Sequence, residues 1–367
     1  MTRSFAVVGA GLAGAATAWR LAQRGERVTV LERATPANRQ GSSHGSARIF
    51  RYAYPDPFYA NLVAEARAHW DELSQAADVP LIRYVGAIDF GAQRDPVHLA
   101  GVLTSIGVEH ELLTASQAAS RWPGMHVDGP VLWQPGAGVI DAASSVNAMI
   151  ALARSAGATV LTDWTVTRLI PGSGRVSIRS AHGDELTVDH VIVAAGGWLP
   201  SLAADLPFRL PPLRITKEQA FHFPYRDPGA AWPTSVHKRG DIATYSLPGG
   251  RDADHRGHKV AEYLGGTDIP SASGNDGIVD PANRRRVVEY VAEYLPGLIP
   301  EPYAETTCVF TMTPTEDFVI DTAGPFTVAS PCSGHGAKFA PLLGALIADS
   351  ALGLAPPADR FRVPPKG

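Results

Sequence analysis

Near the start of this chain of 367 residues, Phe5-Ala6-Val7-Val8-Gly9-Ala10-Gly11-Leu12-Ala13-Gly14 is an apolar run that passes directly into a GxGxxG turn. Helical spacing follows from Ala15 to Gln23, and a second strand is expected from Arg27 to Leu31. The glycines permit a tight turn, close approach of a pyrophosphate and close packing of helix on strand. Glu32 ends the second strand, where its carboxylate can accept ribose hydroxyls. The pattern predicts a βαβ unit that binds a dinucleotide, with the helix N-terminus facing the phosphates.

A second glycine-ended strand bears on which dinucleotide is bound. Val191-Ile192-Val193-Ala194-Ala195-Gly196-Gly197-Trp198 is apolar and then turns at two glycines. Flavoproteins with two dinucleotide-binding motifs place such a strand against the same cofactor, so the sequence favours FAD. A glycine turn that binds nothing and a site for NAD are the alternatives at this point.

Composition and charge restrict the partners. The chain is 45% hydrophobic, and its formal net charge of −4 arises from both signs mixed along its length. We therefore expect no basic stripe for nucleic acid and no polybasic membrane patch. With no such charge pattern, a small-molecule partner is expected. The apolar run at the N-terminus is too short for a signal peptide or a membrane span, which predicts a cytoplasmic protein. Two cysteines, Cys308 and Cys332, cannot form a disulfide framework or a metal-ligand cluster, so no metal is expected.

Periodicity and turn residues divide the rest of the chain. Helices are expected near 59–75, from Ser144 to Ala156 after the start signal Asp141, and from Asn283 to Tyr294. The segment 251–258 is expected to be a charged loop, and the Pro-rich end after Leu354 an exposed tail. Strands are expected at 86–90, 131–133, 159–161, 166–170, 190–194, 318–320 and 326–329.

Further motifs carry a resemblance to a known family. The first is Gly41-Ser42-Ser43-His44-Gly45-Ser46-Ala47-Arg48-Ile49-Phe50-Arg51. Near the other end stand Cys308-Val309-Phe310-Thr311-Met312-Thr313, Asp317-Phe318-Val319-Ile320-Asp321 and Ser333-Gly334-His335-Gly336-Ala337-Lys338-Phe339. With the N-terminus, these motifs extend over nearly the whole chain. The chain resembles the D-amino-acid-oxidase-like FAD-dependent oxidoreductases, in the branch of monomeric sarcosine oxidase and N-methyltryptophan oxidase.

The resemblance implies a fold of the α/β plus α+β class. A Rossmann-like, discontinuous FAD-binding domain is joined to a substrate domain built on a mostly antiparallel sheet. Members of the family are commonly monomers, so a monomer is expected. The FAD-binding domain is expected to comprise residues 1–85, 145–215 and 305–367, and the substrate domain residues 86–144 and 216–304.

The resemblance also implies contacts to the cofactor. Cys308 aligns with the cysteine that carries FAD through a thioether, and the alternative is a small buried hydrophobe. Cys332 matches no known role and is expected to pack. Arg48 is expected close to the flavin, where a fixed guanidinium favours the electron-rich ring. The turn 334–336 is expected to open the last helix, with free amides facing the flavin's pyrimidine edge. The expected cofactor-binding residues are Gly9, Ala10, Gly11, Leu12, Ala13, Gly14, Glu32, Arg33, Ser42, Ser43, Arg48, Val166, Gly196, Trp198, Cys308, Gly334, His335, Gly336 and Lys338.

Arg51 and Lys338 match the two cations that hold a substrate carboxylate in this family. Arg51 would bind through a bidentate fork and Lys338 as a point charge. A surface ion pair is the alternative for Arg51, and a solvated helix side chain is the alternative for Lys338. Tyr263 is also expected to bind substrate, at a position where the family often has a histidine.

The expected catalytic residues are Lys259, Arg48, His44 and Tyr245. Lys259 resembles the lysine that promotes the reaction of the flavin with oxygen, although a solvent-facing lysine in a polar loop is the alternative. His44 lies one helical turn before Arg48 if this segment is helical, and a hydrogen-bonded structural histidine is its alternative. Tyr245 matches an active-site tyrosine.

The implied activity is FAD-dependent oxidation of the C–N bond of a carboxylated secondary amine to an imine, with oxygen reduced to hydrogen peroxide. The substrate class includes sarcosine, other N-methyl amino acids and cyclic imino acids, and the sequence does not identify the member. The alternatives are an amine dehydrogenase of the same fold with another electron acceptor, an NAD-dependent dehydrogenase and a non-catalytic flavin-binding module.

Overall fold

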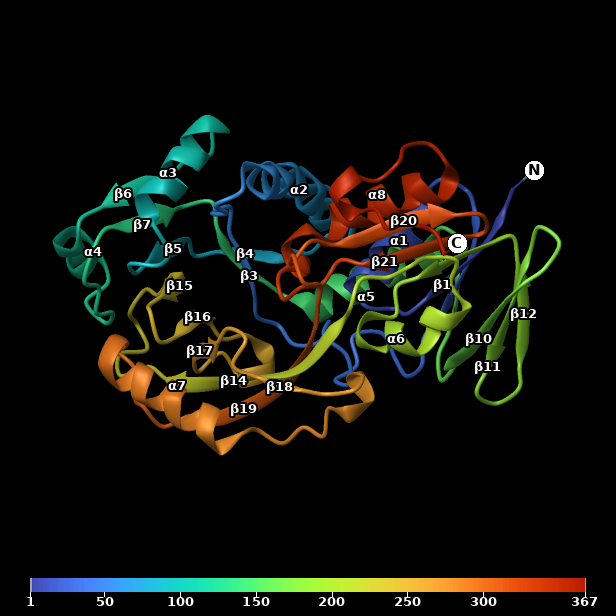
Figure 1. Cartoon of the computed structure of the whole chain (residues 1–367). Helices are drawn as coiled ribbons and strands as arrows, with labels where there is room; N and C mark the ends of the chain where they lie inside the picture. Colours follow the sequence, from blue (N-terminus) through green and yellow to red (C-terminus); the bar gives the residue numbers. More distant parts are fainter. Residues whose placement is uncertain (1, 367) are drawn as a thin grey trace.

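A computed structural model describes residues 2–366 and shows an elongated molecule with one large sheet in each half (Figure 1). The sheet on the right of Figure 1 has six strands in the order β20-β21-β13-β1-β2-β9. Neighbouring strands run parallel except at one edge, where β20 is antiparallel to β21. The strands are β1 (Ser4–Val8), β2 (Arg27–Leu31), β9 (Thr159–Leu161), β13 (His190–Val193), β20 (Val319–Ala323) and β21 (Phe326–Ser330).

Strand β1 shows why both faces of this sheet are covered. Phe5 and Val7 belong to one apolar core, and Ala6 and Val8 to another, because successive side chains of a strand point to opposite faces. Three helices pack together over the first face, and a small antiparallel sheet covers the second. The helices are α1 (Leu12–Gln23), α5 (Ala142–Ser155) and α8 (Ala340–Leu352), and the strands are β10 (Val166–Pro171), β11 (Val176–Ser180) and β12 (Glu185–Val188).

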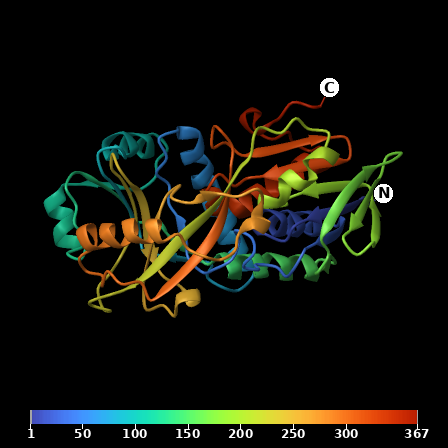
Figure 2. The same cartoon turned by 60° about the horizontal axis from the view of Figure 1, so that its bottom comes forward.

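The sheet in the other half has nine strands, in the order β18-β14-β17-β16-β15-β5-β7-β6 with β19 paired along β14. Among the described strands of this sheet, β15 and β5 form the only parallel pair. Helix α7 (Pro281–Tyr294) lies across one face (Figure 2), where Val287 and Val291 share an apolar core with Phe221. The strands are β5 (Ala87–Phe90), β6 (Glu111–Leu113), β7 (Val131–Gln134), β14 (Arg214–Pro224), β15 (Thr234–Lys238), β16 (Ala243–Pro248), β17 (Gly257–Glu262), β18 (Thr267–Asp268) and β19 (Ala304–Met312).

A small antiparallel sheet and helix α2 (Pro57–Ala76) lie between the two halves (Figure 1). The small sheet consists of β3 (Arg48–Phe50), β8 (Gly138–Ile140) and β4 (Ile82–Tyr84), in that order. Helix α2 packs on α8 through a buried face that includes Trp70, whose indole N–H donates to the carbonyl of Lys338 at 2.7 Å. The middle of the molecule is therefore tied to both halves.

Helix starts follow the sequence signals. Asp56 accepts from the N–H of Phe58 at 2.9 Å ahead of α2, and Asp141 accepts from Ser144 at 2.9 Å ahead of α5. Helix α1 differs, because Gly11 precedes it and has no side chain to cap it. None of the described helices combines the length and apolar character needed to cross a membrane. The remaining helices are α3 (Pro96–Ser105), α4 (Ala115–Arg121) and α6 (Leu199–Leu202).

The expected fold class is confirmed, since a Rossmann-like α/β part is joined to a mostly antiparallel sheet. The expectation of an exposed tail after Leu354 holds for most of its residues, but not for Phe361. Phe361 is buried in the core against Phe58 and Tyr59 of α2, and Arg360 pairs with Asp56 and Asp317. The charged loop is also shorter than expected, because β17 already begins at Gly257. The residue ranges given above for the two domains stay a prediction.

Gly344 allows α8 to approach α1 closely. A Cβ at this position would lie 2.5 Å from the carbonyl carbon of Ala16, so we expect Gly344→Ala to lower the free energy of unfolding by about 1–3 kcal/mol. Gly101→Ala in α3 is the matched control, because a Cβ there meets no atom within 4 Å. Its higher helix propensity predicts a gain of up to about 1 kcal/mol. Urea unfolding measures both, and equal effects would contradict the close α1–α8 contact.

Candidate active site

The first of two neighbouring cavities, of about 510 Å³, begins at the turn between β1 and α1. Gly9 has a φ of +100°, and a Cβ there would lie 2.6 Å from the carbonyl oxygen of Ala194. A Cβ on Gly14 would lie 1.9 Å from the carbonyl oxygen of Gly9. Gly9 and Gly11 line the cavity, whereas Gly14 lets α1 approach the turn. The backbone here is as close to the cavity as a pyrophosphate site requires.

Glu32 lies near this turn, at the end of β2. Its Oε2 accepts a hydrogen bond from the N–H of Ala10 at 2.7 Å, and its Oε1 accepts one from Ala34 at 3.0 Å. Arg33 stacks over the ring of Trp198 at 4.3 Å. A buried carboxylate beside a glycine turn and a helix start fits the adenosine half of a dinucleotide.

Most of the residues expected at the cofactor line this first cavity. The exceptions are Gly14, which lies against the turn, and His335 and Lys338, which line the second cavity instead. The expected residues that line the first cavity are Gly9, Ala10, Gly11, Leu12, Ala13, Glu32, Arg33, Ser42, Ser43, Arg48, Val166, Gly196, Trp198, Cys308, Gly334 and Gly336.

Cys308 lies in β19 beside the guanidinium of Arg48. Nη2 of Arg48 is 3.8 Å from the sulfur and donates to the carbonyl of Ser42 at 3.0 Å, and Nη1 donates to the carbonyl of Ala47 at 3.0 Å. These bonds fix a permanent positive charge next to the thiol. Cys332 accepts the N–H of Thr311 through its sulfur at 3.3 Å, and burial raises its pKa.

Lys259 is buried in β17 rather than solvent-facing. It is 5% exposed, and its Nζ donates to the carbonyl of Ala47 at 3.3 Å. Burial, followed by the charge of Arg48, lowers its pKa to about 7, while Asp252 opposes this shift. Burial and the charges of Arg48 and Lys259 lower the pKa of His44 to about 3, so its ring is neutral. Lys259 and His44 line neither cavity but are grouped with Arg48, which lines both.

The second cavity, of about 370 Å³, meets the first at Arg48, Phe310, Gly334 and Ala337, which line both. A molecule in the second cavity would therefore reach the end of the first where Cys308 lies. Within the described part of the chain, no group of three or more His, Cys, Asp and Glu side chains is placed to hold a metal ion. Arginine and lysine instead dominate the polar wall of the second cavity, through Arg48, Arg51, Arg94, Lys238, Lys338 and Arg360.

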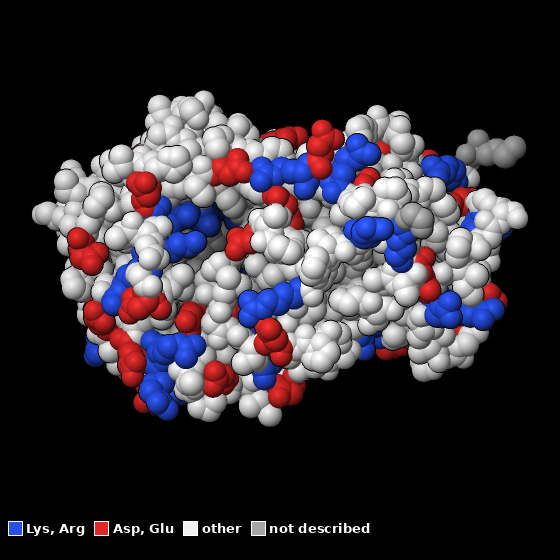
Figure 3. Space-filling view, viewed as in Figure 1, with Lys and Arg blue, Asp and Glu red and all other residues white. Residues whose placement is uncertain are grey.

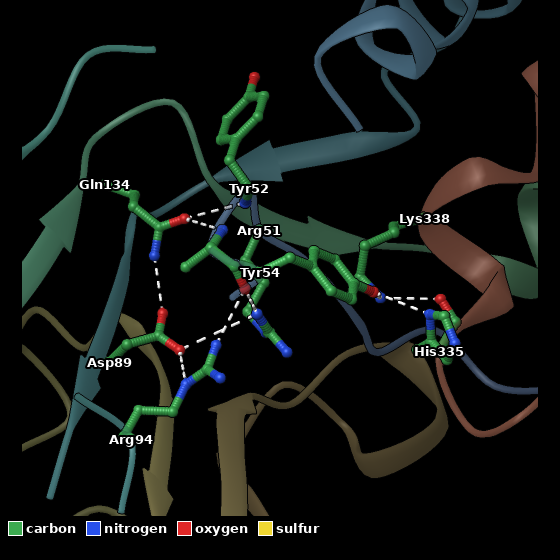
Figure 4. A network of polar contacts seen from close by, with 9 residues as sticks. Arg51, Tyr52, Tyr54, Asp89, Arg94, Gln134, His335 and Lys338 are labelled. Atoms are coloured by element: carbon green, nitrogen blue, oxygen red, sulfur yellow. Dashed lines mark hydrogen bonds and ion pairs between the residues drawn. The ribbon is translucent and has the colours of Figure 1, made fainter. Parts of the chain in front are cut away.

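Figure 4 shows how two of these arginines are held. Arg51 and Arg94 both donate to the carbonyl of Ala53. Nε of Arg94 also donates to Oδ1 of Asp89 at 2.6 Å, and Gln134 donates to the other carboxylate oxygen at 2.7 Å. Arg51 remains 3.9 Å from Asp89. Since no described residue bonds to Nε or Nη2 of Arg51, its fork is available to a ligand.

Lys338 is buried on the same cavity, in the 3₁₀ helix Gly336–Phe339. Its Nζ donates to the hydroxyl of Tyr54 at 2.9 Å and to the carbonyl of His335 at 2.7 Å (Figure 4). Burial, with the charges of Arg51 and Arg94, lowers its pKa well below its ordinary value. An anion in the cavity would favour the charged form again. Lys338 is thus not a solvated helix side chain.

Tyr245 and Tyr263 both line the second cavity. Tyr245 lies in β16, and burial raises the pKa of its hydroxyl, with Arg48 acting in the opposite direction. The ring of Tyr263 lies 5.7 Å from Nζ of Lys238. The structure therefore gathers Arg51, Lys338, Tyr245 and Tyr263 at one site.

Two local expectations are wrong. Residues 41–47 form a loop and Arg48 begins β3, so His44 is not one helical turn before Arg48. The N–H groups of His335 and Gly336 are not free, because both donate to the carbonyl of Cys332 at 3.0 Å. The turn leads into the 3₁₀ helix, and α8 begins only after it.

The sequence did not lead us to the residues that support the second cavity. These residues come from three separate segments of the chain, with Asp89 and Arg94 in one, Gln134 in the second and Lys238 in the third, and they belong to none of the quoted motifs. One signal was present: Asp89 is a lone acid within the apolar strand Ala87–Phe90, and a fully buried carboxylate requires partners.

Comparisons with known proteins agree with this geometry. Residues 4–350 match the family described as DAO, FAD dependent oxidoreductase. An N-methyl-L-tryptophan oxidase of Salmonella arizonae is 30% identical over 96% of this chain and 95% of its own. A monomeric sarcosine oxidase of Streptomyces avermitilis is 29% identical over 94% and 92%. The solved structure of NikD, described as an unusual amino acid oxidase essential for nikkomycin biosynthesis, has a TM-score of 0.87 at 26% identity, covering 99% of this chain and 98% of that one.

Proposed function

Since the chain belongs to the DAO family of FAD-dependent oxidoreductases, we propose that it oxidises the C–N bond of a carboxylated amine, with oxygen as the electron acceptor. Its relatives oxidise sarcosine and N-methyltryptophan, so FAD-dependent oxidation of amino acids is the activity of the family around it. We further propose a secondary amine as substrate: sarcosine, another N-methyl amino acid or a cyclic imino acid. Because this family depends on FAD, we no longer favour an NAD-dependent dehydrogenase.

The observation that carries this proposal is the pair of cations on the second cavity. Arg51 comes from the segment after β3 and Lys338 from the segment before α8, yet both line one cavity that meets the first. Two cations held on one cavity favour an anionic group in it, and a carboxylate matches the fork of Arg51. The α-carbon of a substrate held there would lie toward the boundary of the two cavities.

The residues of the first cavity fit FAD. Gly9 and Gly11 form the cradle for a pyrophosphate, Glu32 provides the carboxylate for a ribose, and Cys308 with Arg48 lies at the far end. Bound FAD supplies the acceptor for two electrons from the amine. The chain itself supplies the geometry and the fixed charges around that acceptor.

The proposed reaction balances with oxygen and water alone. The amine loses one hydrogen from its α-carbon and one from its nitrogen, and a C=N bond forms. The two electrons and two protons convert oxygen into hydrogen peroxide, and water then splits the imine into a carbonyl compound and an amine. Arg51, Arg94 and Lys338 contribute by disfavouring a further positive charge, so the substrate nitrogen binds in its unprotonated form.

Anaerobic mixing of the holoenzyme with candidate amines tests the function. We expect at least one of sarcosine, N-methyl-L-tryptophan, L-proline and pipecolate to bleach the visible absorbance of the cofactor. Aerobic turnover should then consume oxygen and release hydrogen peroxide. Failure of all carboxylated amines to bleach it would refute the proposal, whereas bleaching that oxygen does not reverse would favour a dehydrogenase with another acceptor.

We propose that FAD is attached through Cys308. Its sulfur lines the first cavity and lies beside the fixed guanidinium of Arg48, within reach of a cofactor bound there. After acid precipitation, the yellow colour of the wild type is expected in the protein pellet, and that of Cys308→Ala in the supernatant. Cys332→Ala is the matched control and should keep the colour in the pellet. Colour released from the wild type would disprove the linkage.

The enzyme is further proposed to act as a monomer. Both cavities are lined by residues of one chain, so no second copy is needed to complete the site. Light scattering of the holoenzyme at working concentration would show one chain per particle.

A further inference from the structure

Lys238 is a cation of the second cavity to which the proposed reaction gives no role. It is the last residue of β15, is half-buried, and shares the cavity wall with Arg51, Arg94 and Lys338. No described residue accepts a hydrogen bond from its Nζ or forms an ion pair with it, and the ring of Tyr263 lies 5.7 Å away. Partial burial of an ammonium costs free energy unless an anion lies beside it. We therefore expect an anion next to Lys238.

The strand register fixes where this ammonium lies. Lys238 stands opposite Ala243 of β16, and Val236 stands opposite Tyr245. Residues two apart on a strand share a face, and all four of these residues line the cavity. His237, between the two, points to the other face and is fully buried. The position of Lys238 is therefore built into the sheet and is not that of a mobile surface side chain.

The charges on this wall exceed what one substrate carboxylate can neutralise. Four cations, Arg51, Arg94, Lys238 and Lys338, line this wall, and the fully buried carboxylate of Asp89 lies behind it against Arg51 and Arg94. Asp89 is already engaged by Arg94, and the substrate carboxylate of the proposed reaction would be held by Arg51 and Lys338. Figure 3 shows Lys and Arg side chains gathered at a hollow in the left half of this face. Lys238 is the cation left without a partner.

The opposite rim of the cavity does not supply the missing charge. Arg360 pairs with Asp56 at 2.6 Å and with Asp317 at 2.9 Å, so these two acids are already engaged. Glu316 acts on Lys238 from the exposed side and raises its pKa, against the larger lowering by burial and by Arg94 and Arg51. An exposed, solvent-screened carboxylate is a weak counter-ion.

We propose that Lys238 binds a second carboxylate of the substrate, which makes the substrate an N-substituted amino acid with one further acidic group. This inference rests on the proposed function and specifies its substrate class. One point charge matches a carboxylate, whereas a phosphate dianion needs more donors than Lys238 offers. The cavity, of about 370 Å³, is within the size range of small-molecule sites.

N-methyl-L-glutamate and N-methyl-L-glutamine test the inference, because they differ in the charge of the side chain and hardly in shape. For the wild type, we expect kcat/KM to be about 10- to 100-fold higher for N-methyl-L-glutamate. In the Lys238→Met variant, kcat/KM should be similar for the two substrates, mainly because kcat/KM for N-methyl-L-glutamate falls. Lys217→Met is the matched control, since Lys217 pairs with Asp276 outside the cavity, and it should keep the wild-type ratio.

Glutarate and glutaramate give the same comparison without turnover, as competitors or as ligands that perturb the visible spectrum of the holoenzyme. Glutarate should bind more tightly to the wild type, and the two should bind equally to Lys238→Met. A wild type that prefers neither member of each pair, or a preference that survives in Lys238→Met, overturns the inference. If no carboxylated amine bleaches the cofactor, the proposed function fails, and the binding of glutarate still decides the role of Lys238.

Discussion

Replacing Arg51 with alanine is expected to lower kcat/KM for carboxylated amines by about 100- to 1,000-fold, because a charged, two-bond partner of the carboxylate is lost from the cavity. Lys338 remains in the variant, and the loss of the Arg51 charge should raise its pKa, but a single point charge does not replace the two-bond fork. Oxygen consumption measured against sarcosine or the best substrate found gives the value. A carboxylate that has lost one of its two cationic partners also binds more weakly in the ground state, so KM should rise.

Arg51→Lys separates charge from geometry in this experiment. It keeps the positive charge and loses the fork, so its kcat/KM should lie between those of the wild type and Arg51→Ala. Arg51 also donates to the carbonyl of Ala53, and the visible absorbance of each variant shows whether the cofactor site has survived. An Arg51→Ala enzyme with normal cofactor content and normal kcat/KM would remove Arg51 from the carboxylate site.

The fold could be predicted wherever burial leaves a periodic pattern in the sequence. The βαβ unit at the N-terminus was predicted because alternation, glycines and helical spacing are all local. Strand β3 was not, because Arg48–Phe50 is too short to show a period and forms through pairing with β8, about ninety residues away. The burial of Phe361 was not predicted for a similar reason, because tertiary packing buries it in a Pro-rich segment that carries no periodic pattern.

The residues of the site also fall into those that the sequence could predict and those that it could not. Arg51, Lys338 and Cys308 could be proposed because each lies within a contiguous motif that resembles a family. Asp89, behind the cavity wall, and Lys238, on it, come from neighbouring strands because β5 and β15 pair in parallel, with Asp89 beside Val236. No local pattern contains that register, and a lone aspartate or lysine is too common a residue to indicate it. The support of the cavity therefore became visible only in three dimensions.

Lys259 is the second residue whose loss should have a large effect. At neutral pH its neighbours on other elements include Arg48 of β3 and the carboxylate of Asp252, which bonds to Ser46 through both its side chain and its N–H. The histidines near it, His44 and His222, are neutral at neutral pH because burial lowers their pKa to about 3 and about 4. The charged members of the cluster around Lys259 are therefore Arg48, Asp252 and Lys259 itself.

We expect Lys259→Met to slow the return of the cofactor's absorbance after mixing with oxygen by about 100- to 1,000-fold, because it removes a buried charge that stabilises developing negative charge on oxygen. Anaerobic bleaching by the amine should change much less, and equal losses in both steps would refute the assignment.

The pH dependence of the oxygen step provides the sharper test of Lys259. Its pKa is lowered from its ordinary value to about 7, so the ammonium is present below that pH and lost above it. The rate of the oxygen step should therefore fall as the pH rises through about 7, and Lys259→Met should be slow and insensitive to pH. Asp252→Asn removes the charge that favours the ammonium, which moves the fall to lower pH. Asp254→Asn is the matched control, because Asp254 is exposed and pairs with Arg256. A shift of the same size in both asparagine variants would show that the loop acts on Lys259 through its fold and not through the charge of Asp252.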